Sequence, residues 1–228
     1  MEHVVALHGF AGTGHVWEAV DPRYAAPDLP GHGTASDVAP TFESCVAHVL
    51  ANAPERFVLA GYSMGGRIAL HVALAAPERV ARLVLVATTA GLDGEDERAQ
   101  RRAADERLAS LLEQEGIEAF AERWTAQPLF AGDPPEAREL QRCDVLRNEA
   151  GPLAAALRGT GTGAMTPLWD RLGGLVMPVT VVAGERDAKF LALGERLATG
   201  TGGELVVVPG AGHGLPRETP AAVAAAIG

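Results

Sequence analysis

The sequence predicts an α/β fold in which a mainly parallel sheet carries helices and is interrupted by a helical insertion. Two observations support this prediction. Short apolar runs alternate with helical stretches through most of the chain, and the alternation stops for one long charged stretch. The chain has 228 residues, of which 47% are hydrophobic, and this suits one globular domain, or one domain that carries an insertion.

Six apolar runs are the strand candidates. They are rich in Val, Leu and Ala and are apolar throughout, as expected of parallel strands that are buried on both faces of a sheet. Parallel neighbours require crossover connections, which are right-handed in nearly all proteins. The candidate strands span residues 3–9, 24–33, 56–63, 82–88, 178–187 and 204–213.

Helices are expected in the connections between these strands. The first begins with a possible capping box, for which Thr41 and Ser44 are the cap candidates. The second carries apolar residues at helical spacing and stops before Pro77, and the third ends on a glycine. With a last helix that closes the chain, the candidates span residues 41–53, 64–76, 187–200 and 219–228.

The charged stretch over residues 93–165 contains helical patterns but no strand-like run. A doubly wound sheet seldom needs so long a gap between two strands, so we interpret this stretch as a helical cap inserted into the core. The predicted division is a core formed by residues 1–92 and 166–228, and a cap formed by residues 93–165.

Composition restricts the partners that this chain can have. The net charge of −10 argues against nucleic acid and anionic membranes as binding partners. No apolar run approaches the length of a membrane span. The first residues, MEHVVALHG, are acidic and then strand-like, unlike a signal peptide. Cys45 and Cys143 have no metal-binding spacing and are expected to be small buried residues. The sequence predicts a soluble cytoplasmic protein without a metal, and it leaves the oligomeric state open.

The motif Gly-x-Ser-x-Gly, centred on Ser63 in GYSMGG, lies between an apolar run and a helical stretch. A strand–turn–helix context is typical of a nucleophile elbow, in which the serine hydroxyl stands at the tip of a tight turn. The alternative is a turn of small residues that allows close packing of a strand on a helix. That alternative explains the glycines but gives no reason for the serine.

A serine hydroxyl needs a neighbouring base before it can act, and in this arrangement an acid and then a histidine follow in the chain. Asp187 and His213 each lie just past the carboxyl end of a predicted parallel strand, where such sheets place their sites. His213 would exchange a proton with Ser63, and Asp187 would orient its imidazole. Glu185 is a second candidate for the acid, but the shorter side chain suits this position better.

A glycine-bearing loop, LHGFAGTG, follows the first predicted strand. Such a loop can direct a backbone N–H group into the site, and the N–H group after the nucleophile supplies a second donor. The backbone N–H groups of Phe10 and Met64 are therefore the expected oxyanion hole. His8 and His32 are expected to support the loops around the site and not to titrate in catalysis.

Taken together, these residues resemble the α/β-hydrolase superfamily over nearly the whole chain. The chain begins on what would be the third strand of that fold, so the resemblance implies a compact member without the usual N-terminal hairpin. Within the superfamily, GYSMGGR, WTAQPLF and GERDAKF resemble the MenH family of 2-succinyl-6-hydroxy-2,4-cyclohexadiene-1-carboxylate synthases of the menaquinone pathway. That family eliminates pyruvate from a cyclohexene that carries succinyl and enolpyruvyl groups, without a metal or organic cofactor.

The resemblance also implies residues that bind the several carboxylates of such a substrate. Arg102 competes with Arg101 for its position, and Arg142 lies near Arg147, because the alignment of the insertion is not fixed. Beyond the first histidine, GLPRETP departs from the family, which often has a second histidine before Glu-Asn-Pro. The implied substrate-binding residues are Tyr62, Arg67, Arg101, Trp124 and Arg147.

Three functions fit these patterns. The first is a lyase in which Ser63, made basic by His213 and Asp187, removes a proton from a small anionic substrate. The second is a carboxylic-ester or thioester hydrolase that uses the same three residues as a nucleophile system. The third is a non-catalytic binding protein, which the intact Ser, Asp and His argue against.

Overall fold

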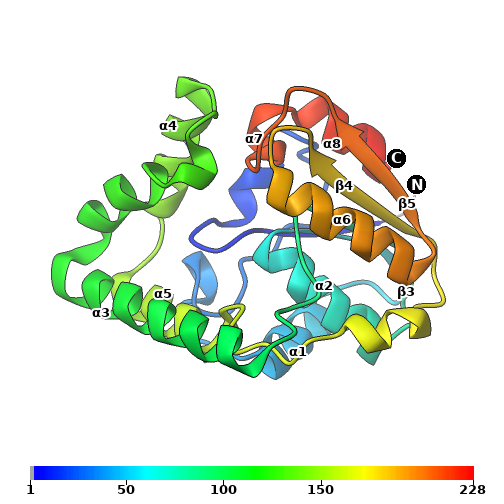
Figure 1. The fold of residues 1–228 in the computed structure, drawn as a ribbon, viewed down its shortest axis with the longest axis horizontal. Coiled ribbons are helices and arrows are strands. Elements are labelled where there is room, and N and C mark those ends of the chain that lie inside the picture. Colours follow the sequence, from blue (N-terminus) through cyan, green and yellow to red (C-terminus); the bar gives the residue numbers. More distant parts are fainter. Residues whose placement is uncertain (1–2) are drawn as a thin grey trace.

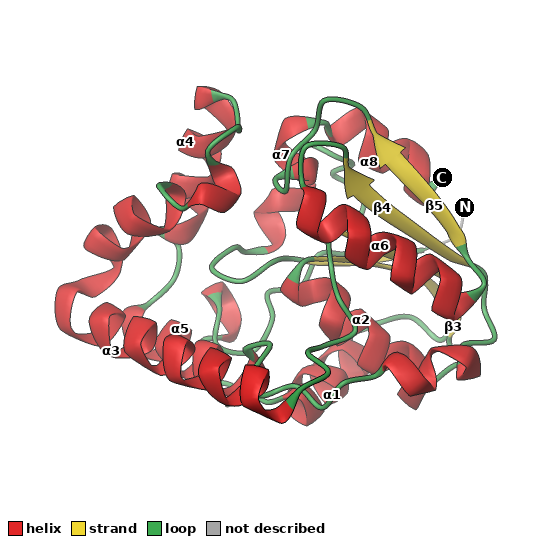
Figure 2. Cartoon of the chain, viewed as in Figure 1, coloured by secondary structure: helices red, strands yellow, loops and turns green. Residues whose placement is uncertain are grey.

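The computed structural model describes residues 3–228, so Met1 and Glu2, which belong to the stretch read above as unlike a signal peptide, lie outside it. Its centre is one five-stranded sheet in which neighbouring strands are all parallel (Figure 1, Figure 2). The strands follow one another across the sheet in chain order, and the predicted parallel α/β architecture is confirmed. They are β1 (Val4–Leu7), β2 (Phe57–Tyr62), β3 (Val80–Val86), β4 (Val179–Gly184) and β5 (Glu204–Val208).

One strand prediction is wrong, because residues 24–33 form a single bridge and not a strand. Ala25 lies beside β1, where its N–H donates to the Val4 carbonyl at 2.9 Å, and its carbonyl accepts from Ala6. Pro27 and Pro30 follow within the same run, and a proline has no N–H group to give to a strand ladder. The pairing therefore ends after one residue.

Four of the helices that cover the sheet begin and end close to the predicted positions, and a fifth, the short helix Leu215–Glu218, was not predicted. At the start of α1, Thr41 and Ser44 form the expected capping box, in which each side chain accepts from the other's backbone N–H at 3.1 and 2.9 Å. These helices are α1 (Phe42–Asn52), α2 (Met64–Ala75), α6 (Ala188–Thr201), α7 (Leu215–Glu218) and α8 (Pro220–Ile227), with 3₁₀ turns at Gly14–Trp17, Gly33–Ala35, Pro128–Phe130 and Trp169–Gly174.

Alternate side chains of the strands enter two separate apolar cores. Leu59 and Leu83 lie on one face, where they pack with residues of α1, α2 and α6. Val58 and Val84 lie on the other face, where they pack with Trp17 and with residues of α7 and α8. Because both faces are covered, the inner strands are apolar at nearly every position, with Arg82 in β3 and Thr180 in β4 as exceptions, which explains the apolar runs in the sequence.

Between β3 and β4 the chain forms helices and no strand, and these helices stand apart from the sheet in Figure 1. A third apolar cluster joins α3 to α5 and includes Ala11 from the core. Within α3 the chain kinks at Gly116, whose φ of 83° is outside the helical range. The long helices of this stretch are α3 (Glu95–Thr125), α4 (Pro135–Val145) and α5 (Ala150–Thr160). The exact boundaries of the cap stay a prediction.

The two cysteines have different environments. Cys45 is buried, and burial raises the pKa of its thiol to about 12, whereas Cys143 is exposed on α4. The expectation that both are buried is therefore wrong for Cys143, which lies on the outer side of a cap helix. Nowhere in residues 3–228 does a helix combine the length and the apolar character that crossing a bilayer requires.

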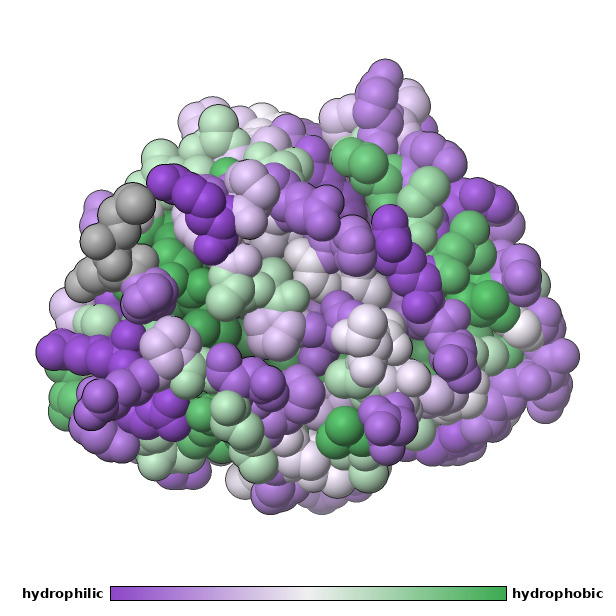
Figure 3. Space-filling view, turned by 180° about the vertical axis from the view of Figure 1, so that it is seen from behind, coloured by the Kyte–Doolittle hydropathy of each residue, from purple (hydrophilic) through white to green (hydrophobic). Residues whose placement is uncertain are grey.

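The rear face of the molecule is a mosaic of hydrophilic areas and smaller hydrophobic ones (Figure 3). Within residues 3–228, the large hydrophobic side chains that are exposed are Leu140, Val176 and Val207, which belong to three different parts of the chain. Exposed residues that are scattered singly are normal for a protein surface and indicate no docking site.

Candidate active site

Ser63 occupies the sharp turn between β2 and α2. Its φ of 53° is positive, which is rare for a residue that carries a side chain and is typical of strained turns at functional sites. A Cβ atom at Gly61 would lie 2.4 Å from the Gly65 carbonyl oxygen, and one at Gly65 would lie 2.3 Å from the Leu7 carbonyl oxygen. The two glycines are therefore required for the turn, which presents the serine hydroxyl above the ends of the strands.

The structure brings His213 and Asp187 to this serine. The His213 Nε2 atom lies 3.2 Å from Ser63 Oγ, and its Nδ1 atom lies 2.8 Å from Asp187 Oδ2. His213 is 2% exposed and Asp187 is 9% exposed. A proton on Nδ1 satisfies the carboxylate and leaves Nε2 free to accept the proton of the serine hydroxyl. The arrangement can generate a base or a nucleophile at Ser63.

Asp187 and its competitor Glu185 lie on the same loop after β4 but contact different groups. Asp187 caps α6 by accepting from the Phe190 N–H at 3.2 Å, which fixes its carboxylate beside the imidazole. Glu185 is exposed and accepts instead from the Gly210 N–H at 2.8 Å. The geometry therefore favours Asp187 as the partner of His213.

Phe10 and Met64 are the residues expected to form the oxyanion hole. Met64 is the first residue of α2, so its N–H group has no acceptor within the helix and is available to a ligand. Phe10 follows β1 and lines the cavity in front of Ser63. This position is compatible with the expected oxyanion hole.

His8 and His32 support the same loop from inside the protein. The Nε2 atom of His8 accepts from the Leu29 N–H at 2.9 Å, and Nε2 of His32 accepts from the Ala11 N–H at 3.3 Å. Both rings are buried, and this burial lowers the pKa of His8 and lowers that of His32 to about 3. Both are therefore neutral at physiological pH, in keeping with the supporting role expected of them.

A cavity of about 400 Å³ opens in front of Ser63 between the sheet and the cap. Trp124 and Phe10 form part of its apolar wall, with their ring centroids 5.1 Å apart. Tyr62 also lines it, and burial raises the pKa of its hydroxyl well above the usual range, so the phenol stays neutral. Four cationic side chains reach the cavity: Arg67, Arg101, Lys189 and Arg217.

Arg67 is the most deeply buried of these cations and is 7% exposed. Its guanidinium donates to the Thr160 carbonyl at 2.5 Å, and no carboxylate within residues 3–228 forms an ion pair with it. Burial, helped by the nearby Arg101, lowers its pKa to about 10, so it remains charged at neutral pH. The Asp105 carboxylate, which pairs with Arg101, opposes this lowering but forms no ion pair with Arg67, so an anionic ligand would stabilise the buried charge.

Arg101 and its neighbour in sequence point in different directions. Arg101 lines the cavity and donates from Nε to Asp105 Oδ1 at 2.8 Å. Arg102 contacts Glu95 and the Gly163 carbonyl instead and does not line the cavity. Consecutive residues of a helix are separated by about 100°, so only one of the two can face the site.

The structure does not bring Arg147 into the cavity. Its side chain is exposed, and it is absent from the cavity wall, as is Arg142, which pairs with Glu122.

Lys189 and Arg217 line the cavity although sequence reasoning did not single them out as site residues. A signal for Lys189 was present, since it is the only lysine in the chain and lies two residues after Asp187. No comparable signal marks Arg217.

Within residues 3–228, no three His, Cys, Asp or Glu side chains gather closely enough to hold a metal ion. Two polar atoms at the cavity wall are buried without a hydrogen-bond partner, Oδ2 of Asp105 and Oε1 of Gln141. These acceptors, together with the cations, give the cavity a mixed polar lining on the side of the cap.

The sequence matches the alpha/beta hydrolase family over residues 4–226. The chain belongs to this family. Its resemblance to the superfamily, inferred above from the elbow and the residues downstream, is confirmed. The match extends across both the sheet and the stretch of helices between β3 and β4, so the alpha/beta hydrolase fold accounts for nearly all of the chain.

Two comparisons confirm the expected resemblance to MenH. A Salmonella typhimurium protein named 2-succinyl-6-hydroxy-2,4-cyclohexadiene-1-carboxylate synthase is 32% identical over 96% of this chain and 90% of its own length. The structure of MenH from S. aureus superposes with a TM-score of 0.87 at 29% identity and covers 96% of this chain and 88% of that one. The structure of an esterase from Thermogutta terrifontis with malate bound is also similar, with a TM-score of 0.83 at 29% identity over 100% of this chain and 88% of that one.

The contact between the cap and the His213 loop is expected to depend on pH. Burial, followed by the neighbouring Glu218 carboxylate, raises the pKa of Asp133 to about 7. An acid whose pKa is raised by folding favours the folded state while it is protonated, so this contribution is lost as the pH rises from about 4 to about 7. Asp133→Asn, which cannot ionise, should therefore gain stability over the parent protein at pH 8, on the order of 1 kcal/mol, and the gain should be smaller at pH 5, where only part of the contribution is lost.

Urea unfolding of both proteins at pH 5 and pH 8 measures this difference. The exposed Asp37→Asn variant serves as the control and should follow the parent at both pH values. A gain for Asp133→Asn that is equal at the two pH values would show that the carboxyl does not titrate in this range.

Proposed function

We propose that this protein is a carbon–oxygen lyase of menaquinone biosynthesis. Its substrate would be a cyclohexene carboxylate that carries succinyl and enolpyruvyl groups, and its products would be pyruvate and 2-succinyl-6-hydroxy-2,4-cyclohexadiene-1-carboxylate. The name of the Salmonella relative and the likeness to MenH support this proposal. We further propose a cytoplasmic location, a small anionic molecule as the partner and no cofactor.

One observation carries the proposal beyond the likeness. The chain has a net charge of −10, yet the cavity in front of Ser63 is lined by four cations, and Arg67 has no carboxylate partner within residues 3–228. Local cations that reverse the overall charge are expected where a substrate carries several carboxylates. A pocket for neutral esters would not require a buried guanidinium that forms no ion pair with a carboxylate of the described residues.

In the proposed reaction, the serine acts as a base. His213 takes the Ser63 hydroxyl proton at Nε2, and the serine oxygen removes the proton next to the succinyl ketone of the substrate. The enolate that forms would be held by the N–H groups of Phe10 and Met64. Its electrons then form a ring double bond and break the bond between the ring carbon and the enolpyruvyl oxygen. The departing pyruvate enolate takes up one proton, so His213 and Ser63 return to their starting states.

A carboxylic-ester or thioester hydrolase is the second candidate. The likeness to the Thermogutta terrifontis esterase favours it, because that protein shares the fold over the whole chain. In this alternative Ser63 attacks a carbonyl carbon, and the same N–H groups hold a tetrahedral oxyanion. Both candidates use Ser63, His213 and Asp187, and they differ in whether the arginines are needed.

Arg67→Ala tests the lyase against the hydrolase. We expect kcat/KM for the succinyl-enolpyruvyl substrate to fall by about tenfold to a hundredfold, because a charge-assisted hydrogen bond to a substrate carboxylate is lost. Any hydrolysis of p-nitrophenyl acetate should change little, since the serine and its partners remain. Arg67→Lys should restore part of the activity, because lysine keeps the charge but not the planar fork. Pyruvate release and p-nitrophenol release measure the two reactions.

Arg138→Ala is the matched control, because Arg138 is exposed on α4 and forms no ion pair within residues 3–228. Equal losses of both activities in Arg67→Ala would assign a structural role to Arg67 and remove the main physical support for the lyase. A parent protein that hydrolyses neutral esters efficiently and never releases pyruvate would be a hydrolase.

A further inference from the structure

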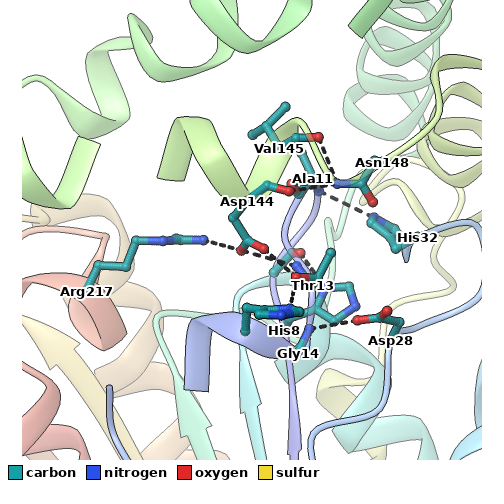
Figure 4. Close-up of polar contacts among 12 residues, drawn as sticks. His8, Ala11, Thr13, Gly14, Asp28, His32, Asp144, Val145, Asn148 and Arg217 are labelled. Atoms are coloured by element: carbon teal, nitrogen blue, oxygen red, sulfur yellow. Dashed lines mark hydrogen bonds and ion pairs between the residues drawn. The ribbon is translucent and has the colours of Figure 1, made fainter. Parts of the chain in front are cut away.

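The loop after β1, residues 9–14, is held by side chains that come from the cap (Figure 4). Asp144, near the end of α4, accepts hydrogen bonds from the Thr13 hydroxyl and, at 3.2 Å, from the Thr13 backbone N–H. Arg217 of α7 donates to the same carboxylate at 2.8 Å. Thr13 and Asp144 are both almost fully buried. A buried carboxylate needs such partners, and here they come from two segments of the chain that are distant in sequence from Asp144.

Asn148 adds two further contacts next to this carboxylate. Its amide nitrogen donates to the Ala11 carbonyl at 3.2 Å, and its amide oxygen accepts from the Gly33 N–H at 3.0 Å. On the other side, the Ala11 N–H donates to His32. Ala11 has a φ of 61°, a conformation that a residue with a side chain adopts only when its surroundings enforce it. The cap side chains supply part of that enforcement.

These contacts bear on the site because Phe10 immediately precedes Ala11. The direction of the Phe10 N–H group depends on the backbone of the loop that Asp144 and Asn148 hold from one side and His32 from the other. Donors that stabilise an oxyanion are effective when their direction is fixed before the reaction. Arg217 also balances the charge of Asp144, which would otherwise oppose a negative charge nearby.

We propose that Asp144 is a positioning residue, through which the cap fixes loop 9–14 so that the Phe10 N–H group points at the developing oxyanion. Asp144 does not touch the substrate in this proposal and acts through Thr13. The proposal depends on the role assigned to Phe10, but it holds for the lyase and the hydrolase alike. A consequence is that removing the Thr13–Asp144 contact slows turnover without weakening substrate binding.

The test compares Thr13→Val, Thr13→Ser, Asp144→Asn and the double variant Thr13→Val/Asp144→Asn. Thr13→Val keeps the shape of the side chain but loses the hydroxyl, and Thr13→Ser keeps the hydroxyl. We expect kcat to fall roughly tenfold in Thr13→Val and Asp144→Asn with KM nearly unchanged, which is less than the ~10²–10³ loss for removing an oxyanion donor entirely. Thr13→Ser should stay close to the parent. The double variant should be no slower than the slower single variant, since both changes break one contact.

Amide hydrogen exchange provides a measurement that does not depend on activity. Peptides covering residues 9–14 should exchange faster in Thr13→Val and Asp144→Asn, while peptides from β2 and α2 should keep the parent rates. Glu136→Ala, an exposed change on the same helix, should alter neither exchange nor kcat. If Asp144→Asn fails to fold, the Val and Ser variants of Thr13 still make the comparison.

Three results would overturn the proposal: a change in KM alone, additive losses in the double variant, or unchanged exchange of loop 9–14 in folded variants. The proposed function fails separately, when the parent protein releases no pyruvate. In that case p-nitrophenyl acetate hydrolysis and hydrogen exchange still report whether Asp144 positions the loop.

Discussion

Ser63→Ala should fold like the parent protein and lose nearly all activity, by roughly 10³-fold or more. The Ser63 Oγ atom lies 3.2 Å from the imidazole Nε2 of His213, and both residues line the cavity. Alanine removes that atom and leaves the histidine with nothing to deprotonate. The turn itself should tolerate alanine, because its glycines and not its hydroxyl allow the close approach of α2 to β1.

Pyruvate release and thermal unfolding of the same preparations measure this result. Ser110→Ala, on the cap helix α3, is the control, since its hydroxyl donates to Glu106 of the same helix and Ser110 does not line the cavity. A folded Ser63→Ala protein with turnover near that of the parent would exclude Ser63 as the reacting group.

Ser63→Gly adds a second measurement on the same residue. The φ of 53° at Ser63 strains any side chain, and glycine adopts such a conformation without strain. Ser63→Gly should therefore be as inactive as Ser63→Ala but more stable, by about 1 kcal/mol. A higher Tm for the glycine variant would indicate that the fold gives up stability to present the hydroxyl.

The elements that were predictable are those whose pattern is local. Parallel strands buried on both faces give unbroken apolar runs, which located β1 to β5 to within a few residues. The elbow glycines, Asp187 and His213 were recognisable because they stand at or just after strand ends. The run at 24–33 misled for an equally local reason, since its prolines break the ladder that its apolar residues suggest.

The residues that were not predictable belong to the cap and to the last loops. Whether a cap arginine faces the cavity depends on how α3, with its kink at Gly116, and α4 pack over the sheet. Neighbouring residues of a helix are turned by about 100°, which separates Arg101 from Arg102. Arg147 lies past the end of α4, where its side chain is exposed and outside the cavity. The contact of Asp144 with Thr13 joins segments 131 residues apart in the chain. No sequence pattern marks such a pair.

Asp187→Asn should fold normally and lose activity by about 10³–10⁴-fold, a loss of the size known for serine proteases with the same change. Asparagine can still accept from the Phe190 N–H and cap α6, so the helix should remain intact. It cannot stabilise the imidazolium, and its amide N–H₂ group turned toward His213 would hold the ring in the wrong tautomer. The loss should therefore appear in kcat, with little change in Tm.

Glu185→Gln is the matched control, because Glu185 lies two residues earlier on the same loop and contacts the Gly210 N–H, not the imidazole. Its amide oxygen can keep that contact, so turnover should stay near the parent value. The pair of variants distinguishes the two candidate acids: a silent Asp187→Asn beside a damaging Glu185→Gln would reverse the assignment. Because Asp187 Oδ2 lies 2.8 Å from the His213 Nδ1 atom, we expect the damage to fall on Asp187.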